Sequence, residues 1–247
     1  MLIVSHRGQT EAGRSDAVPE NTLEAFQRAA ALGVDGIETD IRLSADGCAV
    51  LYHDRLTSDG REVATLTHAE LCSVSGVQVP TLAEAFAALP DLFWLLEVKT
   101  PDAVDAVVEF LRARPASSYL VISFWHAVVE RIVSQVRVRG GVTISHCPTE
   151  SILPTLTSTP RSPVASLKNT AHNRIRSLVW NWEFLDPAVV SRFAERGWMN
   201  LAYGVVTPED HRRCLEVGVD TCITDFPEIL LAPGATGSAG GVLATGP

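Results

Sequence analysis

The acidic and basic side chains of this sequence stand at spacings that suit metal-assisted hydrolysis. Glu38 and Asp40 are two residues apart in Ile-Glu-Thr-Asp-Ile, so on a β-strand both project from one face. Two buried carboxylates on one face repel each other and lose hydration, which is tolerable when a cation lies between them. His53 follows a turn marked by Asp46-Gly47. A pair of acids with a histidine nearby is what a metal-assisted hydrolytic site needs.

Two further segments place the same kinds of side chain at the ends of apolar runs. His6 and Arg7 follow the first apolar run, and Glu97 and Lys99 end a later one. Three carboxylates from neighbouring strands offer the oxygen ligands that Mg²⁺ and Ca²⁺ prefer. His6 and His53 are candidates for the base and the acid. Arg7 and Lys99 can hold the non-bridging oxygens of a phosphate.

Each of these segments also has an explanation that involves no catalysis. The Glu-Thr-Asp run could lie on a surface strand edge, and Glu97 with Lys99 could form an internal ion pair. The segments at 6–8 and 53–54 could be simple turns or caps. Four separate segments would then carry compatible chemistry at one rim by accident, so the catalytic interpretation is favoured.

The alternation of apolar runs and helical periods predicts a (β/α)8 TIM barrel, for which 247 residues is a typical length. Buried strands are predicted at 2–5, 37–41, 92–98, 119–123, 141–145, 178–181, 198–203 and 219–224. Helices are predicted at 22–32, 81–89, 102–112, 127–138, 150–156, 186–195 and 208–216. Asn21 or Thr22 is expected to cap the first of these helices, and Asp186 the helix at 186–195. The charged segments follow the strands, at the end of the barrel where active sites of this fold lie.

Three segments depart from this alternation. Residues 55–80 show two short polar segments without a long period, which predicts a small excursion, such as a lid, between strand two and its helix. The stretch 158–173 is loop-like. Residues 232–247 are rich in Gly, Ala and Ser and are expected to form a flexible tail, which leaves 1–231 as a single barrel domain. A doubly wound open sheet is the alternative fold, but no glycine-rich dinucleotide loop follows the first strand.

Composition and charge narrow the range of partners and compartments. The net charge of -9 argues against a nucleic-acid footprint, which would be basic, and requires an anionic substrate to be attracted locally. Cysteines stand at 48, 72, 147, 214 and 222 without a CxxC pair, which indicates free thiols in a reducing compartment. Neither a signal peptide nor a membrane-spanning run is evident. A cytoplasmic protein without stable membrane insertion is expected, and nothing fixes an oligomeric state.

Nine motifs extend over nearly the whole chain except its tail. They are HRG at 6–8, PENT at 19–22, AF at 25–26, GVDGIETDIRLSADG at 33–47, HD at 53–54, VPTLAEAF at 79–86, LLEVK at 95–99, SF at 123–124 and GVDTCITDFPE at 218–228. The early motifs are specific in combination. With them the sequence resembles the glycerophosphodiester phosphodiesterase family.

The resemblance implies a TIM barrel that hydrolyses a small-molecule phosphodiester, releasing glycerol 3-phosphate and an alcohol. It implies one divalent metal, Mg²⁺ or Ca²⁺, held by Glu38, Asp40 and Glu97. The acid and base pair would be His6 and His53, and the phosphate ligands would be Arg7 and Lys99. Which histidine acts first as the base stays open, and His6 is favoured for that role. The wall of the site or its supporting shell would include Glu20 and Asn21.

The end of the seventh strand departs from the family pattern. Relatives usually carry Trp-Thr-Val-Asn where this chain has Tyr203-Gly204-Val205-Val206, so an aromatic wall is kept at Tyr203 while polar contacts to the alcohol are lost. Phe124 follows the fourth strand and either touches substrate or packs. Asp225 is expected to cap the last helix before Pro227, and a supporting role at the site is the less favoured alternative. Surface or hydrogen-bonded positions are expected for the other histidines, 68, 126, 146, 172 and 211, and core packing for Trp180 and Trp182.

Three other functions compete with this interpretation. A lysophospholipase D-type enzyme, or another phosphodiester hydrolase, would share the site and differ in its leaving alcohol. A non-catalytic phosphate-binding barrel would be expected to lack one of the acids or histidines, and none is lacking. A Schiff-base aldolase using Lys99 conflicts with the flanking acids and with Arg7.

Overall fold

The computed structural model describes residues 1–10, 17–114, 119–145 and 174–231. The helix predicted at 150–156, the loop predicted at 158–173 and the tail predicted at 232–247 lie outside these residues. The same holds for His146, Cys147 and His172. Among the described residues, no helix combines the length and apolar character needed to cross a bilayer.

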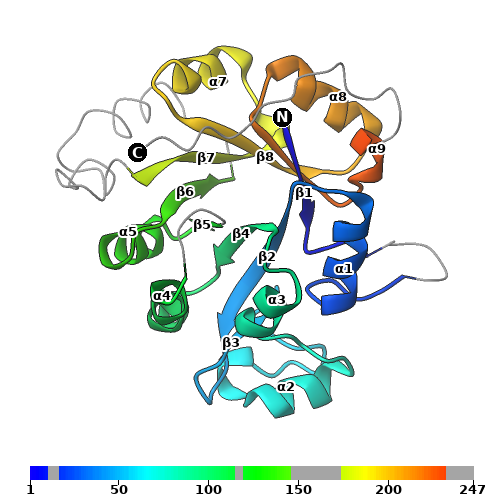
Figure 1. Ribbon diagram of the computed structural model, residues 1–247, viewed down its shortest axis with the longest axis vertical. Helices are drawn as coiled ribbons and strands as arrows, with labels where there is room; N and C mark the ends of the chain where they lie inside the picture. Colours follow the sequence, from blue (N-terminus) through cyan, green and yellow to red (C-terminus); the bar gives the residue numbers. More distant parts are fainter. Residues whose placement is uncertain (11–16, 115–118, 146–173, 232–247) are drawn as a thin grey trace.

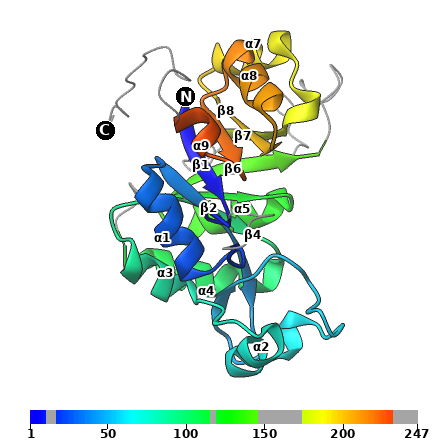
Figure 2. The same ribbon diagram turned by 90° about the vertical axis from the view of Figure 1, so that its right-hand side faces the viewer.

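The sheet closes into a barrel, which confirms the predicted (β/α)8 fold (Figures 1 and 2). Its parallel strands are β1 Leu2–His6, β2 Gly36–Leu43, β4 Phe93–Val98, β5 Tyr119–Ser123, β6 Arg139–Ile144, β7 Ile175–Asn181, β8 Met199–Val205 and β9 Thr221–Thr224. Closure is direct, because β1 pairs in parallel with both β2 and β9. An open doubly wound sheet would have two edge strands, each paired on one side only, whereas here the parallel strands form a closed ring, so that alternative is excluded.

Helices surround the barrel as an outer layer (Figure 1). They are α1 Leu23–Leu32, α3 Leu82–Ala88, α4 Val104–Arg112, α5 His126–Gln135, α7 Pro187–Ala194, α8 Pro208–Val217 and the short α9 Glu228–Leu231. Side-chain caps fix where several begin: Thr22 caps α1, Asp186 caps α7, and Thr81 and Thr207 form capping boxes. The caps predicted at Thr22 and Asp186 are confirmed.

Two apolar layers hold the barrel together. Its interior is filled by side chains from alternating strand positions, Val4, Leu95, Leu120, Ile122, Val179, Leu201 and Ile223. The opposite strand faces pack against the helices, where Trp94 contacts the rings of Phe26 and Phe86 at centroid distances of 5.2 and 5.0 Å. Trp180 is fully buried in this outer layer, as predicted.

The excursion after β2 contains more structure than the sequence indicates. Strand β3, Ala49–Leu51, pairs antiparallel with β2, and the 3-10 turn Val63–Thr65 leads into helix α2, His68–Ser75. The predicted excursion is confirmed, but the helix within it was not predicted. Leu71 is the one fully buried side chain of α2, so no apolar period marks it, and a Thr67–Glu70 capping box starts it instead. Figures 1 and 2 show α2 beside β3, away from the barrel axis.

Candidate active site

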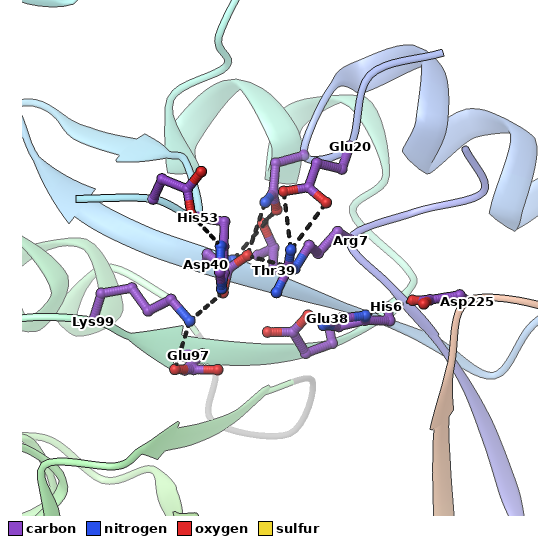
Figure 3. A network of polar contacts seen from close by, with 12 residues as sticks. His6, Arg7, Glu20, Glu38, Thr39, Asp40, His53, Glu97, Lys99 and Asp225 are labelled. Carbon is purple, nitrogen blue, oxygen red and sulfur yellow. Dashed lines mark hydrogen bonds and ion pairs between the residues drawn. The ribbon is translucent and has the colours of Figure 1, made fainter. Parts of the chain in front are cut away.

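Strand register gathers the chemistry-bearing residues at the carboxyl ends of β1, β2 and β4. His6 is the register partner of Glu38, and Asp40 is the partner of Glu97. Because these residues occupy the inward-facing positions of adjacent strands, their side chains meet above the interior core (Figure 3). Glu38 and Asp40 therefore project from the same face of β2, as their spacing in the sequence predicted.

Three carboxylates form a cluster that fits a divalent metal ion. Glu38, Asp40 and Glu97 each offer an oxygen, and these atoms lie within 4.8 Å of one another. Both oxygens of Glu38 are buried without a hydrogen-bond partner. Burial, and then the charges of Asp40 and Glu97, raise the pKa of Glu38 well above its ordinary value. Buried acceptors without donors are costly, and an oxygen-only set suits Mg²⁺ or Ca²⁺.

Two cations lie against these acids. Lys99 Nζ is 2.8 Å from Asp40 Oδ1 and 2.8 Å from Glu97 Oε1, so the internal ion pair considered above exists within the acid cluster itself. Arg7 Nε is 3.0 Å from Asp40 Oδ2. Although burial opposes it, the charges of Asp40 and Glu97 raise the pKa of Lys99, so its amine stays protonated. A Schiff-base nucleophile needs a neutral amine, which argues against an aldolase.

Glu20 and Asn21 support the charged residues from the loop before α1. Arg7 Nη1 donates to both carboxylate oxygens of Glu20, at 3.0 and 2.9 Å. Asn21 donates to Asp40 Oδ2 at 2.9 Å and accepts from Thr39 Oγ1 at 2.6 Å. Arg7 and Asn21 have φ values of 58° and 55°, the only positive values of non-glycine residues in the described ranges. Such strained conformations cluster where surrounding contacts over-determine them, as at this site.

Each of the two histidines is held by an aspartate at the same ring nitrogen. His6 Nδ1 is 2.5 Å from Asp225 Oδ1, and His6 Nε2 faces Glu38 Oε2 at 3.8 Å (Figure 3). His53 Nδ1 is 2.8 Å from Asp54 Oδ1. Because an ionised carboxylate can only accept, each Nδ1 carries a proton and each Nε2 is left for exchange.

Asp225 does not cap the last helix, so that prediction is wrong. Its side chain bonds to His6, while the backbone N–H of Phe226 donates to Thr224 Oγ1. Although burial opposes ionisation, the hydrogen bond and the charge of His6 lower the pKa of Asp225. A supporting role was the less favoured alternative, and the partner His6 was not predicted because it lies 219 residues away. The available signal was that both residues follow the strands that a closed barrel must bring together.

Arg42 is another residue that the sequence analysis did not single out. It comes two residues after Asp40 on the same face of β2, which was the available signal. Its Nε and Nη2 donate to the backbone oxygen of His53 at 2.9 and 2.6 Å. The guanidinium thus holds the chain at the point from which the His53 side chain projects.

Two hollows flank His53. One, of about 210 Å³, is lined by Arg42, His53, Glu97, Lys99, Phe124 and Trp125, and the other, of about 220 Å³, includes Glu20, Asn21 and Asp54. Phe124 is 45% exposed, so it lines the first hollow rather than the core. Its ring meets that of Tyr203 edge-on, with the ring centroids 5.9 Å apart, and the Tyr203 hydroxyl donates a hydrogen bond to the backbone oxygen of Ile144. Tyr203 thus braces Phe124.

The remaining described histidines are satisfied by hydrogen bonds, as predicted. His68, His126 and His211 bond to the backbone oxygens of Val79, Thr143 and Thr207 respectively. Cys48, Cys72, Cys214 and Cys222 are free, which agrees with the prediction for these four thiols.

The fold and site together define a barrel hydrolase of the phosphodiesterase class, and comparison with known proteins gives the family. The sequence profile of the Glycerophosphoryl diester phosphodiesterase family matches residues 6–229. The chain therefore belongs to this family.

Similar proteins extend over nearly the same length. "Probable glycerophosphodiester phosphodiesterase 2" of Mycobacterium tuberculosis is 28% identical, over 93% of this chain and 89% of that protein. A glycerophosphodiester phosphodiesterase of Caldanaerobacter subterraneus subsp. tengcongensis is 27% identical, over 93% and 96%. The crystal structure of the Thermotoga maritima glycerophosphodiester phosphodiesterase superposes with a TM-score of 0.74 at 26% identity, covering 93% of this chain and 96% of the other.

Proposed function

We propose that this protein hydrolyses glycerophosphodiesters to glycerol 3-phosphate and an alcohol with the help of one divalent metal ion. Family membership supplies the reaction class. The observation that supports the proposal most is the pair of aspartate-held histidines, His6 and His53, beside a cluster of three carboxylates in which both oxygens of Glu38 are buried without a hydrogen-bond donor. Proton exchange and charge neutralisation are the two tasks that cleavage of an anionic diester requires.

The metal ligands in this proposal are Glu38, Asp40 and Glu97, and the ion is Mg²⁺ or Ca²⁺. When bound, the ion supplies positive charge that offsets the phosphate charge as it redistributes. Arg7 and Lys99 contribute further positive charge to the phosphate. Glu20 orients Arg7, and Asn21 orients Asp40.

The histidines move the protons. His6 Nε2 removes the proton of the glycerol hydroxyl next to the phosphate, and that oxygen forms a bond to phosphorus. The bond between phosphorus and the leaving alcohol breaks, and His53 Nε2, protonated at the start, gives its proton to the departing oxygen. Water then opens the cyclic phosphate with the two histidines in exchanged roles. Asp225 and Asp54 keep both rings oriented throughout.

The alcohol lies in the hollow beside Phe124 in this proposal, with Tyr203 supporting the aromatic wall. Gly204 follows Tyr203 with a φ of 77°, a conformation in which a side chain is disfavoured. The strand end therefore offers shape and apolar surface instead of polar side chains at this position, which favours recognition of the glycerol phosphate over recognition of the alcohol.

The test is release of glycerol 3-phosphate from glycerophosphocholine in Mg²⁺, Ca²⁺ or EDTA. We expect metal-dependent release in the wild type and its loss in His6→Ala and in His53→Ala. His68→Ala is the matched control, because that histidine lies in the excursion and bonds only to a backbone oxygen. Release from lysophospholipids alone would reassign the substrate. A protein that binds no metal would overturn the role of the three carboxylates.

A further inference from the structure

The cations at the mouth of the barrel differ in how they are paired. Arg7 contacts Glu20 and Asp40, Lys99 contacts Asp40 and Glu97, and Arg55 contacts Glu62 at 2.6 Å. Arg42 has no such contact with any carboxylate of the described ranges. Its hydrogen-bond partner is the neutral backbone oxygen of His53. Arg42 therefore lies near these acids without a direct ion pair to any of them.

The position of Arg42 directs this charge into the proposed substrate hollow. Glu38, Asp40 and Arg42 alternate along one face of β2, so the guanidinium lies beyond the acids toward the mouth. The side chain is half-buried and lines the hollow of about 210 Å³ together with Lys99 and Phe124. A half-buried charge interacts more strongly with a ligand than an exposed one, because water screens it less.

The guanidinium also has hydrogen-bond donors to spare. An arginine carries about five N–H donors in a planar fork. Two of these bonds go to His53, through Nε and Nη2 on one edge of the fork. The Nη1 edge has no protein partner in the described structure and is not among its fully buried polar atoms. Charge-assisted hydrogen bonds from such an edge match the oxygens of a phosphate.

We propose that Arg42 binds the phosphate of the substrate through its Nη1 edge while its other edge holds the main chain of His53. This assignment rests on the proposed function, because it takes the hollow to be the phosphodiester site. Arg7 and Lys99 can bind phosphate only while shared with their carboxylates, whereas Arg42 has no carboxylate to share. One guanidinium thus fixes the distance between the bound phosphate and the main chain of His53, the proposed general acid.

The test compares binding of sn-glycerol 3-phosphate by calorimetry, in Mg²⁺, to wild type, Arg42→Gln and Arg55→Gln. Arg55→Gln is the matched variant, because it removes the same charge from the same mouth but from an arginine that Glu62 already neutralises. We expect Arg42→Gln to weaken binding about 10- to 100-fold, as for loss of a charge-assisted hydrogen-bonded pair. Arg55→Gln should change it less than about threefold.

Kinetics separate binding from a purely structural role. In glycerophosphocholine hydrolysis, Arg42→Gln should raise KM and lower kcat. Arg42→Lys keeps the charge but not the planar fork, so it should restore part of the wild-type KM while its kcat stays low. Arg42→Lys also serves if Arg42→Gln fails to fold, because a lysine can still reach one oxygen. An affinity of Arg42→Gln for sn-glycerol 3-phosphate equal to that of the wild type would overturn the proposal. Equal losses in Arg42→Gln and Arg55→Gln would also overturn it, because they indicate only long-range charge.

Failure of this inference is distinguishable from failure of the proposed function. A wild type that binds glycerol 3-phosphate through Arg42 but cleaves no glycerophosphodiester would contradict the reaction and support the phosphate contact. A wild type that cleaves the diester while Arg42→Gln binds and turns over normally would support the reaction and overturn the contact.

Discussion

His6 and Asp225 lie 219 positions apart in the sequence, yet a hydrogen bond of 2.5 Å joins Nδ1 of the one to Oδ1 of the other. Pairing of β1 with β9 brings them together, with Ser5 opposite Thr224 one residue earlier on each strand. Since Asp225 is ionised, it fixes the proton on Nδ1 and leaves Nε2 directed at the acid cluster.

Asp225→Asn should lower kcat while leaving metal binding intact. An amide can donate to Nδ1, which places the ring proton on Nε2 and removes the base. By analogy with the equivalent change in a serine-protease triad, the loss should reach about 10²- to 10⁴-fold. The measurements are kcat on glycerophosphocholine and metal affinity by calorimetry. Asp225→Glu, which keeps an acceptor, should lose less. Unchanged kcat in Asp225→Asn would show that the dyad is structural only.

Glu38→Gln should stabilise the metal-free protein at neutral pH. Burial and like charges raise the pKa of Glu38 in the folded state above its ordinary 4.5. The folded protein therefore holds this proton when the unfolded chain has released it, so the free energy of unfolding falls as pH rises above 4.5 toward the raised value. The substitution removes that dependence.

The measurement is thermal unfolding in EDTA at pH 4 and pH 8, for wild type and Glu38→Gln. The Tm of the variant should exceed that of the wild type at pH 8 and be closer to it at pH 4. In a domain of this size, each kcal/mol of stability corresponds to about 2–4 °C in Tm. Adding Mg²⁺ or Ca²⁺ should raise the Tm of the wild type more than that of the variant. A variant less stable than wild type at pH 8 in EDTA would contradict the account.

Asn21→Ala should destabilise the protein by about 2–4 kcal/mol, because three buried hydrogen bonds of the Asn21 side chain are lost. Part of the loss comes from the backbone, since Asn21 has a φ of 55° and alanine tolerates that region poorly. Asn21→Gly relieves the backbone but not the hydrogen bonds and should be about 1 kcal/mol more stable than Asn21→Ala. Urea unfolding of both variants checks this. Identical values would mean that the positive φ costs nothing here.

Phe124→Ala should impair catalysis without affecting stability. The ring is 45% exposed and lines the hollow beside Lys99, so its removal leaves no core cavity. Loss of about 1–2 kcal/mol of apolar contact corresponds to a fall in kcat/KM of roughly 5- to 30-fold. Trp94→Ala, at a fully buried position, is the contrasting variant and should unfold at much lower urea. A destabilised Phe124→Ala would place the ring in the core instead.

Most of the fold follows from local sequence, because strands and helices leave periodic traces. The spacing of Glu38 and Asp40 and the caps at Thr22 and Asp186 act over a few residues, and each is found as predicted. Helix α2 was missed because it buries a single side chain and so has no apolar period. Contacts between distant residues that form only when the barrel closes were harder to predict. Asp225 was assigned to its nearest helix, because local rules do not indicate which distant residue a strand end will face.

The site residues divide in the same way. The three carboxylates, His6 and His53 stand out by residue type at strand ends. The role proposed for Arg42 depends on its having no ion pair with a carboxylate of the described residues, which follows from the three-dimensional structure and not from the sequence. The contact of Lys99 with two acids likewise follows from the register of β2 against β4.

Closure of the barrel between its first and last strands has a consequence for synthesis on the ribosome. At typical rates of about 5–20 residues per second, roughly 10–40 s separate translation of His6 from that of Asp225. Until β9 arrives, β1 has an open edge and His6 lacks the acceptor that sets its tautomer. The residues of the acid cluster are therefore synthesised early and the partner of His6 last, so the His6 ring can take its final orientation only once β9 completes the barrel.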